Sequence, residues 1–136
     1  MRKYLLVLMC MSLVLAACAP APSSLTGTWK LTSYGPKEAP TPAVTDAEAT
    51  LTFGNDGSVG GSGGCNSLGG AYEVDGDQIT FSNITSTLMA CDDARMAQEG
   101  AVTQVLTGTA DYEINGSTLT LTNNDKVLIF SATSYP

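Results

Sequence analysis

Residues 71–81 read AYEVDGDQITF, and this stretch decides the fold class. Apolar and polar side chains alternate on both sides of Asp75-Gly76, which is the pattern of two half-buried strands joined by a tight turn. The same arrangement recurs over residues 112–122, YEINGSTLTLT, with Asn115-Gly116 at the turn. The two stretches therefore predict two antiparallel β-hairpins.

The alternation extends outward from these hairpins along most of the chain. Further strands are predicted over residues 27–34 and 49–53, around Val59, and over 126–130. The sequence therefore predicts a mainly β protein in which about eight short strands form a strongly curved, barrel-like antiparallel sheet. A sheet of this size can close around its own side chains or around one small ligand.

One segment, residues 92–106, has the period of a helix instead. Asp92 and Asp93 stand where carboxylates cap the first amides of a helix, and Gly108 follows its expected end. We therefore expect one amphipathic helix, packed across an end or an open side of the sheet. Its apolar face consists of Ala94, Ala97, Ala101, Val102, Val105 and Leu106.

The first residues have the features of a secretory signal peptide. Arg2 and Lys3 precede an apolar run over residues 4–15, which at about 18 Å is too short to cross a hydrocarbon core of about 30 Å. The end of the run, Leu15-Ala16-Ala17-Cys18, resembles the lipobox of bacterial lipoproteins. We expect residues 1–17 to be removed, Cys18 to be acylated, and residues 18–24 to form a tether.

This resemblance also predicts where the protein is found. The chain would be exported and held at the cell envelope by its lipid, on the outer membrane of a two-membrane cell because Ala19, not Asp, follows the cysteine. In a cell with one membrane, it would stand on the outer face of the cytoplasmic membrane. The alternatives are a plain signal peptide with an accidental cysteine and a membrane-spanning anchor.

Charge and composition exclude several classes of function. The 136 residues carry 13 acidic and 6 basic side chains and no histidine. A chain this acidic does not bind nucleic acid, and histidine-dependent catalysis and histidine metal sites are absent. Catalysis by carboxylates alone remains open, but Asp56, Asp75, Asp77 and Asp125 fall at turns, where solvation explains them better. We therefore expect no enzymatic activity, no cofactor and no metal.

The cysteines and glycines point to structure more than to chemistry. Cys10 lies in the discarded segment, and the remaining pair, Cys65 and Cys91, predicts a disulfide in an exported domain. Two free buried thiols or a metal pair are the alternatives. Eight of the 14 glycines lie between Gly54 and Gly70. No Lys-Ser/Thr follows them, so close backbone packing at a bend of the sheet is preferred over a phosphate-binding loop.

These elements together resemble the META domain family, which includes the HslJ-like heat-shock lipoproteins. The resemblance runs from about residue 25 to residue 130, and we assign the domain to residues 25–136. It implies a small curved β-barrel with one helix, frequent lipoprotein anchoring and a link to heat or envelope stress, with no established catalysis. Ser67-Leu68-Gly69-Gly70 departs from the family pattern, which has a bulky residue before the glycine. The motifs are Gly27-x-Trp29-x-Leu31, Thr52-Phe53, Gly63-Gly64-Cys65-Asn66, Gly70-x-Tyr72, Ser86-Thr87-x-Met89-Ala90-Cys91, Glu99, Leu106 and Leu119-x-Leu121.

The candidate site residues come from these motifs and are interpreted first as structural. Asn66 is expected to hold a turn through its amide, and Glu99, near the middle of the helix, to accept hydrogen bonds from the glycine-rich loop. The full set is Trp29, Gly64, Asn66, Tyr72, Thr87, Met89 and Glu99, together with Cys18, Cys65 and Cys91.

The resulting hypothesis is a non-enzymatic, monomeric envelope lipoprotein with a stress-related accessory or binding role. Its partners would be the membrane, through the lipid, and either an envelope protein or a hydrophobic ligand. The alternative is a carrier of lipids or hydrophobic small molecules with a lipocalin-like cavity. A filled or hollow barrel interior distinguishes the two.

Overall fold

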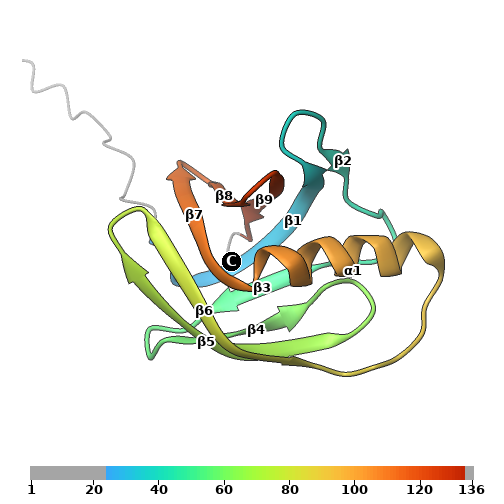
Figure 1. Cartoon of the computed structure of the whole chain (residues 1–136), viewed down its shortest axis with the longest axis horizontal. Helices are drawn as coiled ribbons and strands as arrows, with labels where there is room; N and C mark the ends of the chain where they lie inside the picture. Colours follow the sequence, from blue (N-terminus) through green and yellow to red (C-terminus); the bar gives the residue numbers. More distant parts are fainter. Residues whose placement is uncertain (1–23, 134–136) are drawn as a thin grey trace, which may run out of the picture.

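Apart from one two-residue strand, strands that follow one another along the chain also lie side by side in space, in one antiparallel sheet (Figure 1). The computed structural model describes residues 24–133, so the predicted signal peptide and Cys18 lie outside the described residues. Pairing of β1 with β9 closes the sheet into a barrel. The strands are β1 (Gly27–Pro36), β2 (Thr41–Pro42), β3 (Thr50–Phe53), β4 (Ser58–Ser62), β5 (Ser67–Asp75), β6 (Gln78–Ser86), β7 (Gly108–Asn115), β8 (Thr118–Asn123) and β9 (Lys126–Ala132).

Eight of these strands form the barrel, which confirms the predicted fold class. The ninth, β2, is a two-residue strand that pairs with the end of β1 that β3 does not reach. The two predicted hairpins are β5–β6 and β7–β8, and Gly76 and Gly116 take the positive φ values, 62° and 60°, that such turns need.

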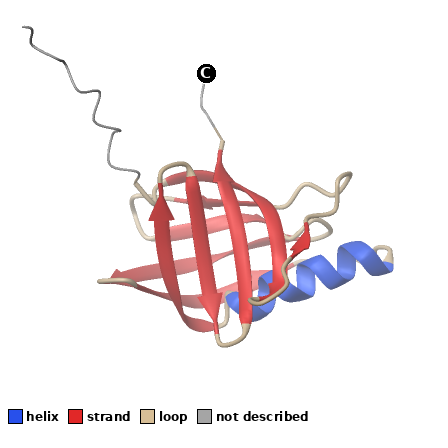
Figure 2. Cartoon of the chain, turned by 90° about the horizontal axis from the view of Figure 1, so that it is seen from above, coloured by secondary structure: helices blue, strands red, loops and turns tan. Residues whose placement is uncertain are grey.

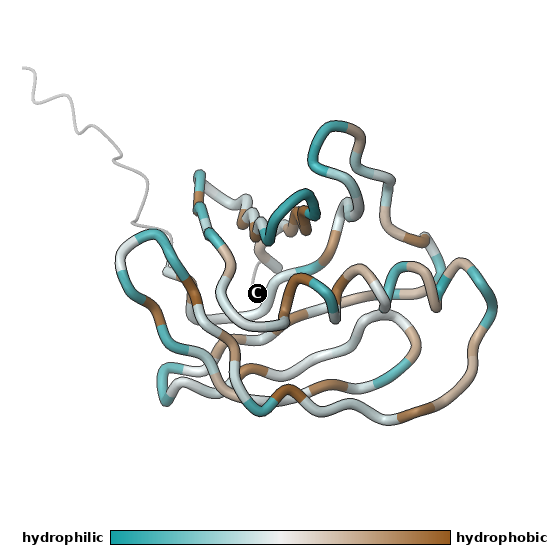
Figure 3. The backbone as a smooth tube through the Cα atoms, viewed as in Figure 1, coloured by the Kyte–Doolittle hydropathy of each residue, from teal (hydrophilic) through white to brown (hydrophobic). Residues whose placement is uncertain are grey.

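The β3–β4 turn is held by a side chain. The carboxylate of Asp56 accepts hydrogen bonds from the hydroxyl of Ser58 at 2.6 Å and from its amide at 3.0 Å. These bonds, the hydroxyl first, keep the pKa of Asp56 below its ordinary value. Hydrophilic residues gather at this turn and at the β5–β6, β7–β8 and β8–β9 turns (Figure 3).

Strands β4 and β5 are longer than predicted because they run through the glycine-rich stretch. Gly60, Gly61, Gly69 and Gly70 lie within them, and Gly60 pairs with Gly69 across the two strands. Gly61 has a φ of 153°, and a Cβ atom there would stand 1.9 Å from the carbonyl oxygen of Thr50. Glycine is therefore required where β4 crosses close to β3.

The one helix within residues 24–133, α1 (Asp93–Val105), covers one end of the barrel (Figure 2). It starts after Asp92, whose side chain accepts from the amide of Arg95 at 3.2 Å, and Gly108 beyond its end has a φ of 77°. These bounds match the predicted helix to within one residue. Within residues 24–133, no helix combines the length and the apolar character needed to cross a membrane.

The interior of the barrel is packed with the protein's own side chains. Alternate residues of the strands point inward and form one buried cluster, and the helix adds Val102, Val105 and Leu106 to it. The chain enters at the opposite end, where the indole nitrogen of Trp29 donates to the carbonyl of Leu25 at 2.8 Å. The largest fully buried members of the strands are Leu51, Phe53, Ile79, Leu119, Leu121, Leu128 and Phe130.

Candidate functional site

Most of the predicted site residues meet where α1 lies against the β4–β5 turn and the β6–α1 link. We call the side chains of Asn66, Thr87, Gln98 and Glu99 the polar brace. Asn66, Gln98 and Glu99 are buried, although they are polar or charged. A buried polar group is costly unless it finds hydrogen-bond partners, so their bonds decide what this cluster does.

Asn66 and Glu99 form the centre of the brace. One carboxylate oxygen of Glu99 accepts from the amides of Cys65 at 3.2 Å and Asn66 at 2.5 Å. The other accepts from the side-chain nitrogen of Asn66 at 2.5 Å. The β4–β5 turn is thereby tied to the middle of the helix, as expected for Glu99 from its position.

The same asparagine also holds the link between β6 and α1. Its side-chain oxygen accepts from the hydroxyl of Thr87 at 2.8 Å and from the amide of Met89 at 2.7 Å. Its side-chain nitrogen donates in addition to the carbonyl of Met89 at 3.1 Å. Both ends of the Asn66 amide are therefore fully used inside the protein.

Gln98 repeats this role on the other side of the helix. Its oxygen accepts from the amide of Val44 at 2.7 Å, and its nitrogen donates to the carbonyls of Ala47 at 3.1 Å and Gly63 at 3.0 Å. Sequence reasoning missed this residue. The available signal was its position on the apolar face of the helix, four residues before Val102 and seven before Val105.

The disulfide joins the β4–β5 turn to the β6–α1 link covalently. Cys65 and Cys91 are bonded, with their Cα atoms 6.1 Å apart, which confirms the predicted pairing. The bond fixes the residue before Asn66 to the residue before the helix cap. The β4–β5 turn and the start of α1 are therefore held by both hydrogen bonds and a covalent link.

Two glycines of the motif allow the helix to approach this turn. A Cβ atom on Gly63 would stand 2.8 Å from Cγ of Glu99, and one on Gly64 would stand 2.5 Å from the side-chain nitrogen of Gln98. Gly64 also has a φ of 109°. Larger residues would therefore separate the brace from the loop that it holds.

The remaining predicted residues lie elsewhere. Trp29 is in the core at the entry end of the barrel, and the hydroxyl of Tyr72 donates to the carbonyl of Gly54 at 2.7 Å. The ring of Tyr72 also packs edge-on against Phe53, with centroids 5.1 Å apart. The motif residues therefore fall into two groups. One surrounds Asn66 in the brace, and the other consists of Trp29 and Tyr72, which pack elsewhere in the barrel.

The chemistry of the brace is structural. Within residues 24–133, every buried side-chain nitrogen and oxygen has a hydrogen-bond partner. The same part of the chain contains no group of three or more Asp, Glu, Cys or His residues arranged to hold a metal ion. The side chains of the brace all form hydrogen bonds within the protein, and the bonds of Asn66 fix the β6–α1 link.

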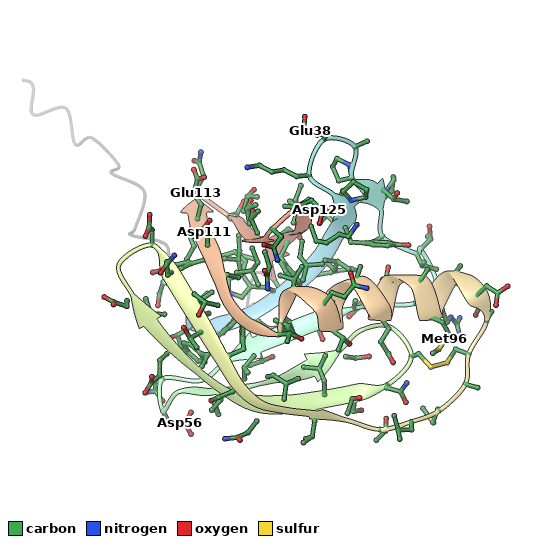
Figure 4. All side chains as sticks on the ribbon, in the orientation of Figure 1. Glu38, Asp56, Met96, Asp111, Glu113 and Asp125 are labelled. Atoms are coloured by element: carbon green, nitrogen blue, oxygen red, sulfur yellow. A yellow bond between two sulfur atoms is a disulfide. The ribbon has the colours of Figure 1, made fainter. Side chains whose placement is uncertain are left out.

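That link presents apolar side chains to solvent. Leu88 is 95% exposed, Met89 is 58% exposed, and Met96 on the first turn of the helix is 40% exposed. We call these three residues the apolar tip. In Figure 3 the link runs through hydrophobic colours at the end of the molecule that carries the start of α1, and Figure 4 places Met96 beside the disulfide.

The fold and the brace together define a small antiparallel β-barrel closed at one end by a helix that a disulfide holds in place. The profile of the META domain family matches residues 23–135, and the chain belongs to this family. No curated protein matches the chain.

Solved structures show the same fold. A protein from Burkholderia xenovorans, solved by NMR, is 23% identical with a TM-score of 0.68, and the match covers 88% of this chain and 94% of that one. A DUF4847 family protein from Bacteroides vulgatus is 16% identical with a TM-score of 0.59, over 82% of this chain and 95% of that one. At these identities the likeness concerns the fold.

Proposed function

We propose that this protein is a non-enzymatic, monomeric lipoprotein of the cell envelope that supports tolerance of heat or envelope stress by docking to an envelope protein. The observation that carries the proposal is the apolar tip. Asn66 holds the backbone of Met89, the disulfide fixes Cys91 two residues further on, and the side chains of Leu88 and Met89 remain exposed to water. Exposed apolar groups of this kind favour a protein contact, and methionine adapts to varied partner surfaces.

The position of the tip fits an anchored protein. The described chain enters the barrel at one end, and the start of α1 and its preceding link lie at the other (Figures 1 and 2). A lipid on Cys18 would hold the entry end near the membrane, so the tip would face away from it. The acidic surface would keep the domain away from the membrane, because anionic headgroups repel it.

The packed interior favours this proposal over the hydrophobic carrier. A carrier needs a ligand-sized cavity lined by apolar groups. Here side chains from opposite walls, together with Val102 and Val105 from the helix, meet in one cluster. A thermal-shift screen of the purified chain with lipids and hydrophobic drugs separates the two functions, since a saturable stabilisation by an apolar ligand would favour the carrier.

Anchoring is tested with two cysteine variants. Mass spectrometry of the mature N-terminus should show an acylated Cys18, and Cys18→Ser should move the protein from the membrane fraction to the soluble fraction. Cys10→Ser is the matched control, because that residue lies in the segment predicted to be removed. An unmodified N-terminus, or equal fractionation of the two variants, would contradict the anchoring.

Docking is tested in a strain that lacks the protein. Wild-type protein should restore survival under heat or envelope stress, and Leu88→Ser/Met89→Ser should fail to do so at equal abundance. Val74→Ser is the control, because Val74 is also an exposed apolar residue, at 44%, but lies away from the tip. Full rescue by the tip variant, or loss of rescue by the control, would reject the tip as the docking surface.

A further inference from the structure

Both methionines of the folded domain belong to the apolar tip. The chain contains five methionines, and Met1, Met9 and Met11 lie in the segment predicted to be removed. The other two, Met89 and Met96, have exposed side chains. Methionine is frequent in protein cores, yet the buried cluster in the described part of this chain contains none. The thioether groups of the domain are therefore placed where solutes reach them.

The other groups that oxidise readily are protected. The remaining sulfur atoms of the described chain belong to Cys65 and Cys91, which are bonded to each other and so present no thiolate to an oxidant. The indole of Trp29 is buried in the core, and the sequence contains no histidine. A two-electron oxidant that approaches the domain therefore meets the thioethers of the apolar tip first.

The structure fixes the place from which these thioethers project. The side chain of Asn66 accepts from the amide of Met89 at 2.7 Å and donates to its carbonyl at 3.1 Å. The backbone of Met89 is therefore held at both of its polar groups. Met96 lies in the first turn of α1, and Figure 4 shows it beside the disulfide that holds the start of this helix.

We propose that Met89 and Met96 form a modification site, at which a hypohalous acid converts them to methionine sulfoxide and thereby prevents docking by the apolar tip. The thioether sulfur takes the oxygen atom of hypochlorous acid. Sulfur loses two electrons, chlorine gains them and leaves as chloride, and one proton is released to water. The consequence for docking rests on the function proposed above, whereas the modification itself does not.

Sulfoxide formation changes the tip without changing the fold. The product is a polar side chain, and burial of its oxygen against an apolar partner is unfavourable unless a hydrogen-bond donor meets it. Both methionines lie outside the buried cluster, so their oxidation removes no packing from the barrel. The expected product is a folded domain that no longer docks.

The modification is tested on the mature protein purified from cells, with about two equivalents of hypochlorous acid. Peptide mapping by mass spectrometry should place one added oxygen atom on each methionine. The matched control, Met89→Leu/Met96→Leu, keeps the tip apolar and should gain no oxygen in the same peptides. The melting temperature of the oxidised wild type should stay within about 3 °C of the untreated value. Absence of oxygen on both methionines, earlier oxidation of Trp29, or a larger loss of stability would overturn the inference.

The consequence is tested in a strain that lacks the protein, under heat or envelope stress and at equal abundance of the variants. Met89→Gln/Met96→Gln makes the tip polar and should fail to restore survival, whereas Met89→Leu/Met96→Leu should restore it. After a sublethal pulse of hypochlorous acid, the wild type should lose its rescue and the leucine variant should keep it. Equal survival with the two proteins after the pulse would overturn the inference. Full rescue by Leu88→Ser/Met89→Ser without oxidant would reject docking by the tip and this consequence with it, while the oxygen gained at the methionines would still stand.

Discussion

At the scale of single residues, the side chain of Gln98 connects the helix to two separate loops. Its side chain has no exposed surface, and its three hydrogen bonds all go to backbone groups of the β1–β3 connection and the β4–β5 turn. The bonds to Ala47 and Gly63 are buried, and the bond from Val44 is partly buried. The side chain of Gln98 therefore supplies hydrogen bonds that water would otherwise supply to the backbone of two loops.

Replacing Gln98 with alanine should lower the free energy of unfolding by about 2–4 kcal/mol. The change removes the side-chain amide and leaves buried backbone groups without partners. Chemical denaturation measures the effect. The control is Gln104→Ala on the same helix, where the side chain is exposed and the change should be within about 0.5 kcal/mol. Equal stability of the two variants would show that the bonds of Gln98 are not stabilising.

At the scale of elements, the sequence predicted the strands, but it predicted only part of the contacts between the helix, the loops and the sheet. Strands such as residues 78–81 bury alternate side chains, and this leaves a period of two in the sequence. The continuation of β4 and β5 through Gly60 and Gly69 left no such signal, since glycine has no side chain to alternate. The role of Glu99 followed from its helical position, whereas the partners of Gln98 depend on loops whose path the sequence does not encode locally.

The joint between α1 and the sheet depends on the disulfide. Reducing it, or introducing Cys65→Ser/Cys91→Ser, should lower the free energy of unfolding by about 3–4 kcal/mol, because the bond closes a loop of 26 residues. Denaturation with and without reductant measures the effect. Reductant should not destabilise the double variant further. Unchanged stability on reduction of the native protein would show that the brace alone is sufficient.

At the scale of the whole molecule, one buried cluster connects every wall of the barrel and the helix. Strands from both ends of the chain contribute to it, so no part of the barrel has a core of its own. The apolar tip lies outside this cluster. Changes at the tip should therefore leave the fold intact.

A single core predicts a single unfolding transition. The fluorescence of Trp29, the one tryptophan of the chain, reports on the entry end, and far-ultraviolet circular dichroism reports on all the strands. The two signals should give the same denaturation midpoint, as expected for two-state unfolding. Midpoints that differ reproducibly would show that the entry end unfolds separately from the rest.

Pairing between β1 and β9 has a consequence for how the chain reaches this structure. The hydroxyl of Thr133 donates to the carbonyl of Thr28, a contact that spans 105 positions in the chain. The first strand to be synthesised therefore waits for the last before its free side is covered. Contacts this distant slow folding, because the loop-closure entropy is lost before the contact compensates for it. Throughout that delay the nascent chain exposes two strand edges that can pair with a neighbouring chain, so synthesis and delivery must keep such chains apart until the final strand arrives.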